Sequence, residues 1–147
     1  IAGIIRTSGV FVRDENGDKV MGVDGRPNRK SGMFQSLQAA GWMYNENTAQ
    51  VSMNLLDHNV TGLHTVTDAI RSEATKIGMD AVAGELVGLV PLSAMISAGK
   101  HYHNESNCDD ESTLVQSAIN GLMLDELGEF DPYNSIIEWA LENNLGD

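Results

Sequence analysis

The alternation of apolar and polar residues is clearest in the middle of the chain. From Ala49 to Leu55 every second residue is apolar, which predicts a half-buried β-strand. The segment 34–44 leans to the same period of two after Ser36, and the turn-forming residues 45–47 join it to the next segment. We therefore expect a β-hairpin here.

Helical spacing is found on both sides of this hairpin. The apolar residues of 61–77 recur at intervals of three or four, and the segment ends at Gly78, as amphipathic helices do. Pro91 stands at the first position of a further helix, where proline is tolerated. Two more helices are expected in the tail, over 114–122 and 131–141, the second opened by an Asp-Pro cap.

The remaining segments are shorter or less regular. Residues 1–9 predict a short helix that ends at a glycine, and residues 10–13 a short strand. Residues 14–32 are rich in Gly, Asp and Asn, so we expect a long loop. The apolar segment 79–90 predicts another strand.

This order of elements predicts an α+β fold. One strand placed before residue 1 would complete βαββαβ, the ferredoxin-like (split βαβ) sheet with helices on one face, here without its first strand and followed by two C-terminal helices. Alternatively, residues 10–13 supply the missing strand. We expect a single domain over 1–147, with an α/β core over 1–104 and an acidic helical tail over 105–147. Because the chain starts with Ile1 and not Met, we expect it to be a piece of a longer protein.

The composition of the chain indicates which kinds of binding partner and which cellular compartment to expect. The net charge is −12, and all nine Lys and Arg lie at or before Lys100, which argues against nucleic acid. No apolar run is long enough to span a bilayer, and we expect no secretory leader. The single cysteine, Cys108, excludes an internal disulfide and fits a reducing compartment. We expect a cytoplasmic protein that binds no nucleic acid and no membrane.

Basic residues gather in the first thirty positions, where six Lys and Arg face four acids. In an acidic chain, such a cluster can face an anionic ligand. Arg26, Arg29 and Lys30 are the candidates for this role. The alternative is a loop whose own acids, Asp24 among them, neutralise the bases.

Polar residues inside apolar elements are candidates for ligand contact. Asn54 lies on the polar side of its strand, where an amide can donate and accept hydrogen bonds, and a satisfied strand-end residue is an equal alternative. Glu85 interrupts an apolar strand, so it must be edge-exposed, paired or functional. His101 and His103 point to different sides of a helix end and make a poor metal site. We expect no metal.

Two more candidates stand at the start of the helix predicted over 61–77. Thr61 is favoured as the N-cap, although an exposed first turn could also receive a substrate carboxylate. His64 lies in the first turn, beside the apolar stripe. A packed, hydrogen-bonded core histidine is the favoured interpretation, with substrate binding as the alternative.

Several stretches resemble a known family. They are Ala40–Tyr44 with Ala49–Leu55, Val60–His64, Gly84–Leu92, Phe130–Pro132 and Ile136–Glu138. In this order, and in register from Ile1 to Trp139, they resemble the C-terminal subdomain of glutamate formimidoyltransferases, also called formiminotransferases. The individual stretches are not catalytic signatures, but several long ones in the right order are a specific signal.

The resemblance implies a function in histidine catabolism. Enzymes of this family transfer a formimino group from N-formiminoglutamate to tetrahydrofolate, the co-substrate, which is held between two α/β subdomains. Their catalytic histidine lies in the N-terminal subdomain, and no position here corresponds to it, so the chain alone is expected to be inactive. The implied partners are that subdomain, folate and formiminoglutamate, with a homodimer also expected. The alternative is a stand-alone, non-catalytic binding or dimerisation module.

Overall fold

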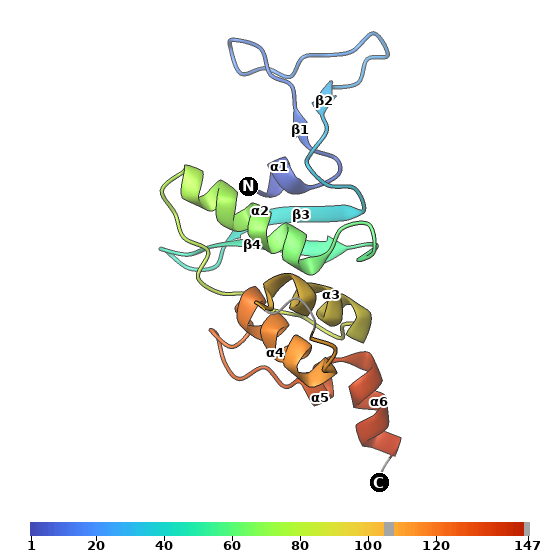
Figure 1. Cartoon of the computed structure of the whole chain (residues 1–147). Helices are drawn as coiled ribbons and strands as arrows, with labels where there is room; N and C mark the ends of the chain where they lie inside the picture. The colour runs from blue at the N-terminus through green and yellow to red at the C-terminus, as the bar shows by residue number, and fades with distance from the viewer. Residues whose placement is uncertain (105–107, 146–147) are drawn as a thin grey trace. The chain divides into compact units, whose positions relative to one another are not determined.

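The computed structural model describes residues 1–104 and 108–145 and shows an α+β fold (Figure 1). Over these residues there are two small antiparallel sheets and six helices, compatible with the predicted split βαβ arrangement. The chain divides into two compact units, Ile1–Thr61 and Gly62–Asp147. The division into a core over 1–104 and a tail over 105–147 stays a prediction.

The predicted hairpin is confirmed in the first unit. Strands β3 (Leu37–Met43) and β4 (Ala49–Leu55) pair antiparallel, with Leu37 opposite Leu55 and Met43 opposite Ala49. The Asn45 side chain accepts a hydrogen bond from the backbone N–H of Asn47 at 2.9 Å, which is how asparagine stabilises a turn. Helix α1 (Ala2–Ile5) packs against β3 and is shorter than the helix predicted over 1–9.

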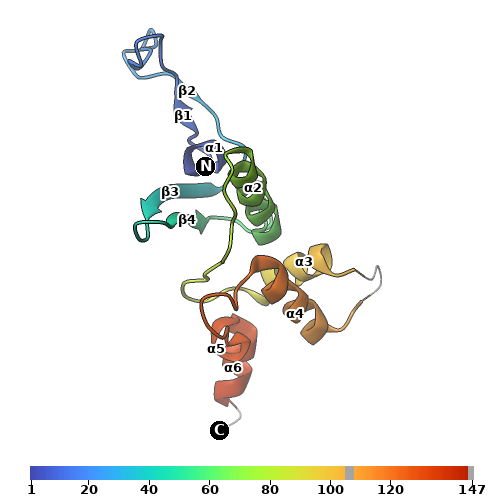
Figure 2. The same ribbon diagram turned by 90° about the vertical axis from the view of Figure 1, so that its left-hand side faces the viewer.

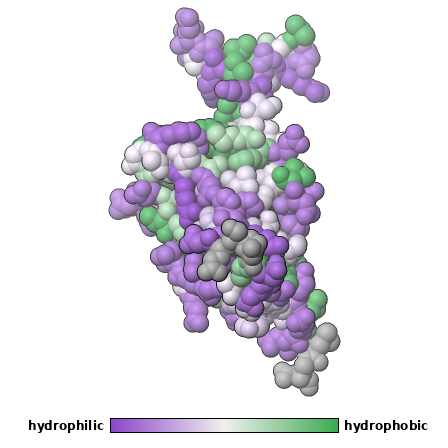
Figure 3. Space-filling model, viewed as in Figure 1, coloured by the Kyte–Doolittle hydropathy of each residue, from purple (hydrophilic) through white to green (hydrophobic). Residues whose placement is uncertain are grey.

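Residues 10–30 form a narrow ribbon that stands away from the β3–β4 hairpin (Figure 2). Strand β1 (Val10–Phe11) pairs with β2 (Arg29–Lys30), and isolated bridges continue the pairing into the predicted loop. The alternative in which residues 10–13 supply the missing sheet strand is therefore wrong, because their partners lie in the ribbon itself. The ribbon is mostly hydrophilic with hydrophobic patches (top of Figure 3), and Val23 is fully exposed.

The second unit is helical. It contains α2 (Leu63–Lys76), α3 (Leu92–Tyr102), α4 (Glu111–Leu122), α5 (Pro132–Ser135) and α6 (Ile137–Leu145). Helices α3 and α4 lie side by side (Figure 1) and bury Met95, Ala98 and Ala118. Their backbones approach closely at Gly99, where a Cβ atom would lie 2.1 Å from the carbonyl oxygen of Leu114. Glycine at this position therefore permits the tight packing of the core.

Two predictions for this unit are wrong. Residues 79–90 form no strand among the described residues, and the backbone N–H of Gly84 bonds the carbonyl oxygen of Met123 at 3.0 Å instead. The helix predicted over 131–141 is broken at Ile136, which makes a parallel bridge with Val90. Both differences have one cause: backbone groups in these segments find partners that are distant in sequence.

None of the helices in the described parts of the chain combines the length and the apolar character that a bilayer crossing requires.

Candidate functional site

The β3–β4 hairpin presents one polar, solvent-exposed face. The register places Gln38 opposite Asn54 and Trp42 opposite Gln50, and Ser52 lies between the two glutamine-containing pairs. Alternate residues of a strand point to the same side, so these five side chains share a face. Gln38, Ser52 and Asn54 are exposed, as the alternation predicts for Asn54. We call this group the hairpin face.

Of this face, only Asn54 is predicted from the sequence as a ligand contact, and Trp42 is the most prominent residue that the prediction lacks. Its indole is 61% exposed although tryptophan is usually well buried. The signal was present, because the period of two that directs Leu37 and Met43 to one side directs Trp42 to the other. An exposed indole beside amide and hydroxyl groups can stack on a flat ring while its neighbours form hydrogen bonds.

The basic residues of the ribbon are held in different ways. The Arg29 guanidinium donates from Nη1 to the carbonyl oxygen of Ser8 at 2.7 Å, and its Cζ lies 3.9 Å from the centroid of the Phe11 ring. Lys30 and Arg26 are exposed, and Arg26 follows a turn in which Asp24 accepts its backbone N–H. Across the described residues, no ion pair joins a base of the ribbon to an acid of the ribbon. The basic charge is therefore not cancelled by direct pairing.

Thr61 and Glu85 have contrasting surroundings. Thr61 is 2% exposed and its hydroxyl donates to the carbonyl oxygen of Gln35 at 2.6 Å. The N-cap of α2 is Gly62, so the expectation that Thr61 caps this helix is wrong. Glu85 is exposed, which removes the cost of burying its charge. Substrate binding by either residue stays a prediction.

His64 belongs to a polar cluster that joins α2 to α3. Its ring stacks on His101, with ring centroids 4.6 Å apart. Nε2 of His101 lies 2.7 Å from Oδ2 of Asp68, and the Tyr102 hydroxyl donates to Oδ1 of Asp68 at 3.0 Å. Arg71 donates from Nη2 to the carbonyl oxygen of Gly121 on α4 at 2.6 Å and from Nη1 to Asp68 at 3.3 Å. We call these five side chains the α2–α3 cluster.

The charges of the α2–α3 cluster follow from burial and hydrogen bonding. Burial alone would raise the pKa of Asp68, but hydrogen bonds from His101, Tyr102 and Arg71 hold it below the usual value. Burial and the hydrogen bond to Asp68 raise the pKa of Tyr102 to about 12. Burial, and then the nearby His101, lower the pKa of His64. At neutral pH the cluster therefore holds an ionised Asp68, a protonated Tyr102 hydroxyl and a neutral His64.

The expectation for His64 is wrong in one respect. The residue is half-buried, but its Nδ1 is buried without a hydrogen-bond partner. His101 and His103 point to different helices, as expected, since Nδ1 of His103 lies 3.0 Å from the hydroxyl of Ser117 on α4. Within the described residues, no three His, Cys, Asp or Glu side chains are arranged to hold a metal ion. The expected absence of a metal stays a prediction.

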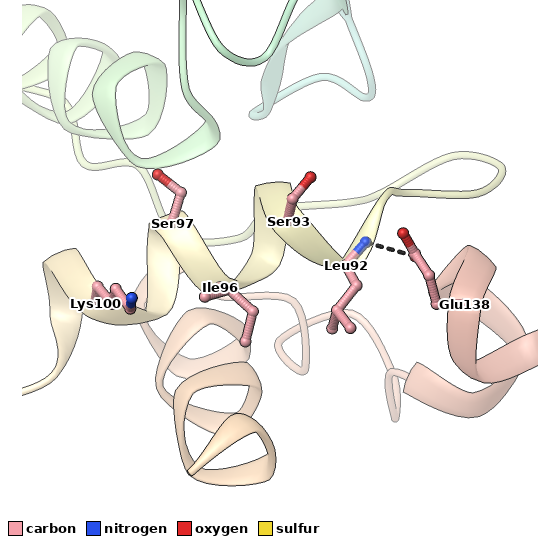
Figure 4. A pocket seen from close by; sticks show the side chains of 6 residues that line it. All are labelled: Leu92, Ser93, Ile96, Ser97, Lys100 and Glu138. Carbon is pink, nitrogen blue, oxygen red and sulfur yellow. Dashed lines mark hydrogen bonds between the residues drawn. The ribbon is translucent and has the colours of Figure 1, made fainter. Parts of the chain in front are cut away.

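A shallow pocket of about 490 Å³ lies along α3 (Figure 4). It is lined by Leu92, Ser93, Ile96, Ser97, Lys100 and Glu138. Two of these residues, Leu92 and Ile96, are aliphatic, and the Glu138 carboxylate accepts a hydrogen bond from the backbone N–H of Leu92. Its other polar groups are the hydroxyls of Ser93 and Ser97 and the ammonium of Lys100, whereas the hairpin face presents an indole and amides.

Comparison with known proteins identifies similar sequences. The formiminotransferase domain family matches over residues 11–142. The chain is 40% identical over 128 residues to the formimidoyltransferase-cyclodeaminase of Rattus norvegicus, covering 82% of this chain and 23% of that protein. The corresponding protein of Dictyostelium discoideum is 36% identical over 124 residues, with 82% and 23% covered. The glutamate formimidoyltransferase of Thermoplasma acidophilum is 33% identical over 75 residues, with 51% and 25% covered. The chain thus spans about a quarter of the length of these relatives.

Proposed function

The chain belongs to the formiminotransferase domain family, and we propose that it is the C-terminal subdomain of a glutamate formimidoyltransferase whose hairpin face forms part of the folate site. The whole protein would transfer the formimino group from N-formiminoglutamate to tetrahydrofolate during histidine catabolism. The observation that supports this role is that the exposed Trp42 and Asn54 lie on one face of β3–β4, at its two ends, with the Ala40–Ser52 pair between them.

The chemistry of folate suits this face. The pterin ring is flat and carries several hydrogen-bond donors and acceptors at its edge. An indole offers a stacking surface, and amide groups such as those of Gln38 and Asn54 both donate and accept. The apolar residues of the hairpin other than Ala40 and Trp42 alternate onto the other side, and Gln38, Trp42, Ser52 and Asn54 are exposed on the hairpin face.

The chemical step would need a second subdomain. Tetrahydrofolate N5 attacks the amidine carbon of formiminoglutamate, the bond from that carbon to the glutamate nitrogen breaks, and the departing nitrogen takes a proton. A histidine with a pKa near neutrality suits this proton transfer. We place that histidine in the N-terminal subdomain, the proposed partner of this chain, and expect the chain alone to be inactive. Two facing subdomains would hold the substrates in line.

The basic end of the ribbon extends the proposal to the tail of the folate. Folate polyglutamates carry a chain of carboxylates, which guanidinium and ammonium groups bind well. Arg26, Arg29 and Lys30 are exposed and unpaired by acids of the ribbon. We assign to them the attraction of this tail. A cytoplasmic location and a homodimer complete the proposal, the former supported by the single cysteine.

Calorimetric titration with tetrahydrofolate polyglutamate tests the proposed site. Trp42→Ala and Asn54→Ala should each weaken binding by about tenfold, the effect of losing about 1.4 kcal/mol. Asn120→Ala is the matched control, since Asn120 is an exposed asparagine on α4 of the other unit. If the chain alone does not bind at millimolar ligand, the titration is repeated with the N-terminal subdomain added. Binding that neither substitution weakens in either format would overturn the role of the hairpin face.

A further inference from the structure

The α2–α3 cluster lies within the second unit and has no part in the transfer chemistry proposed above. His64 and Asp68 are four residues apart and therefore lie on the same side of α2. His101 and Tyr102 are the last two residues of α3. The cluster thus connects the first turns of one helix to the end of another.

Asp68 is the anchor of this connection. Its carboxylate is bound from three directions, by His101 at 2.7 Å, Tyr102 at 3.0 Å and Arg71 at 3.3 Å. The pKa of Tyr102 is raised to about 12, so its hydroxyl stays protonated at neutral pH. It can therefore donate its hydrogen bond to the ionised Asp68. Direct hydrogen bonds therefore hold this half of the cluster together.

His64 is the incomplete half. Its ring lies against His101, and its Nδ1 is buried without a partner. In a neutral ring Nδ1 can be the unprotonated nitrogen, which leaves one uncharged acceptor unsatisfied there. A protonated ring would place a positively charged N–H in the same position, without an acceptor and beside a second imidazole, and burying an unpaired charge is far more costly than burying an unpaired neutral group.

We propose that His64 is a proton-operated switch, which holds the first turn of α2 against α3 when neutral and releases that turn when it binds a proton. The groups around His64 decide whether its protonation is unfavourable in the packed turn. Asp68 favours the proton, but its carboxylate is already bound by three donors. From α3, the ring of His101 stacks on His64 and the Tyr102 hydroxyl donates to the backbone carbonyl of His64. From α4, among the described residues, the cluster is bound by the uncharged carbonyl of Gly121.

The direction of the effect follows from linkage. Because the pKa of His64 is lowered in the folded state, the released turn binds a proton more readily than the packed turn. The free energy of release therefore falls as the pH falls from 6.5, the ordinary histidine value, towards the lowered value. The first turn of α2 comes directly after Gly62, so its release adds free chain between the two units in mildly acidic conditions.

Nuclear magnetic resonance can follow the proton and the turn in one sample. The ring signals of His64 and His101 are recorded from about pH 4.5 to about pH 7.5, the range that brackets histidine titration. Amide exchange of Val66, whose N–H bonds the carbonyl oxygen of Gly62, reports on the turn, and Leu114 in the first turn of α4 is the control amide. The protection factor of Val66 should fall as His64 protonates, by at most about tenfold per pH unit, which is the slope for one proton. The protection factor of Leu114 should not change with the protonation of His64.

Two variants separate the switch from a merely structural role. His64→Phe keeps a stacked ring that cannot bind a proton, so Val66 protection should lose its dependence on pH. His103→Gln is the matched control, because His103 bonds Ser117 and not the cluster, and it should leave the dependence unchanged. A His64→Phe protein that still loses Val66 protection in acid would overturn the proposal. If that variant does not fold, the titration of the unmodified chain tests the proposal instead. Protonation of His64 without a change in the protection factor of Val66 would also overturn it.

Discussion

Glu138 on α6 caps the amino end of α3: its Oε2 accepts a hydrogen bond from the backbone N–H of Leu92 at 2.7 Å (Figure 4). The residue at the N-cap of α3 is Pro91, which has no side-chain acceptor. A carboxylate 46 residues away in the sequence therefore does what a local Ser or Asp does in other helices, and it also lies at the positive end of the helix dipole.

Glu138→Ala should destabilise the chain by about 1 kcal/mol, the typical value for removal of a capping side chain. Denaturation with urea, measured by circular dichroism, gives the difference. Glu142→Ala is the control, because Glu142 is an exposed glutamate of the same helix with no capping bond. Equal losses for the two variants would mean that the bond to Leu92 contributes nothing to stability.

Gly121→Ala should be destabilising although alanine favours helices by about 1 kcal/mol over glycine. A Cβ atom at position 121 would lie 2.1 Å from Cδ2 of Tyr102, so the tyrosine ring must move and its hydroxyl must leave Asp68. Overpacking of this kind costs about 1–3 kcal/mol.

A double-mutant cycle with Tyr102→Ala checks the cause of this loss. With the ring removed, alanine at position 121 should be neutral or stabilising, since the three atoms nearest to the added Cβ all belong to the Tyr102 ring. If Gly121→Ala costs the same in both backgrounds, the contact with Tyr102 is not the reason for the loss.

Local patterns predicted most elements, because the residues that define them are close in sequence. The alternation in 49–55 gave β4, and Asp131 accepts backbone N–H groups at the start of α5, as its Asp-Pro pair suggested. The segment 79–90 and the break at Ile136 could not be predicted in this way. Their backbone partners, Met123 for Gly84 and Val90 for Ile136, become neighbours only after folding.

In the candidate site, too, the residues placed by local patterns could be predicted, and those placed by tertiary packing could not. The exposed position of Asn54 followed from alternation alone, and that of Trp42 was available from it. The α2–α3 cluster was not predictable beyond the spacing of His64 and Asp68, because His101 and Tyr102 meet Asp68 only through the packing of two helices. Arg29 shows the same limit, since its contact with Phe11 depends on the register of the ribbon.

Removal of the basic groups of the ribbon should change the substrate preference of the reassembled enzyme between folates with long and short glutamate tails. In an enzyme reassembled with the N-terminal subdomain, the triple variant of Arg26, Arg29 and Lys30 to alanine should lose its preference for polyglutamylated over monoglutamate tetrahydrofolate. The reason is the loss of three cations that would bind the glutamate carboxylates. The ratio of kcat/KM for the two substrates is the measurement. A charge-conserving variant, R26K/R29K/K30R, should keep the preference, and an unchanged ratio in the alanine variant would rule out the proposed role.

Low pH should reduce the stability of the folded chain, in part through protonation of Asp68. Because the pKa of Asp68 is lowered on folding, its contribution to stability is complete above about 3.8, the ordinary value, and is lost as the pH falls through the lowered folded value. Tyr102→Phe removes one of the donors that lower this pKa, so the carboxyl signal of Asp68 in a carbon-detected titration should move to higher pH. Asp80→Asn, a change at an exposed aspartate outside the cluster, should leave that signal where it is. An Asp68 titration that Tyr102→Phe does not move would show that the hydroxyl contributes nothing to holding the carboxylate ionised, leaving His101 and Arg71 as its only effective partners in the cluster.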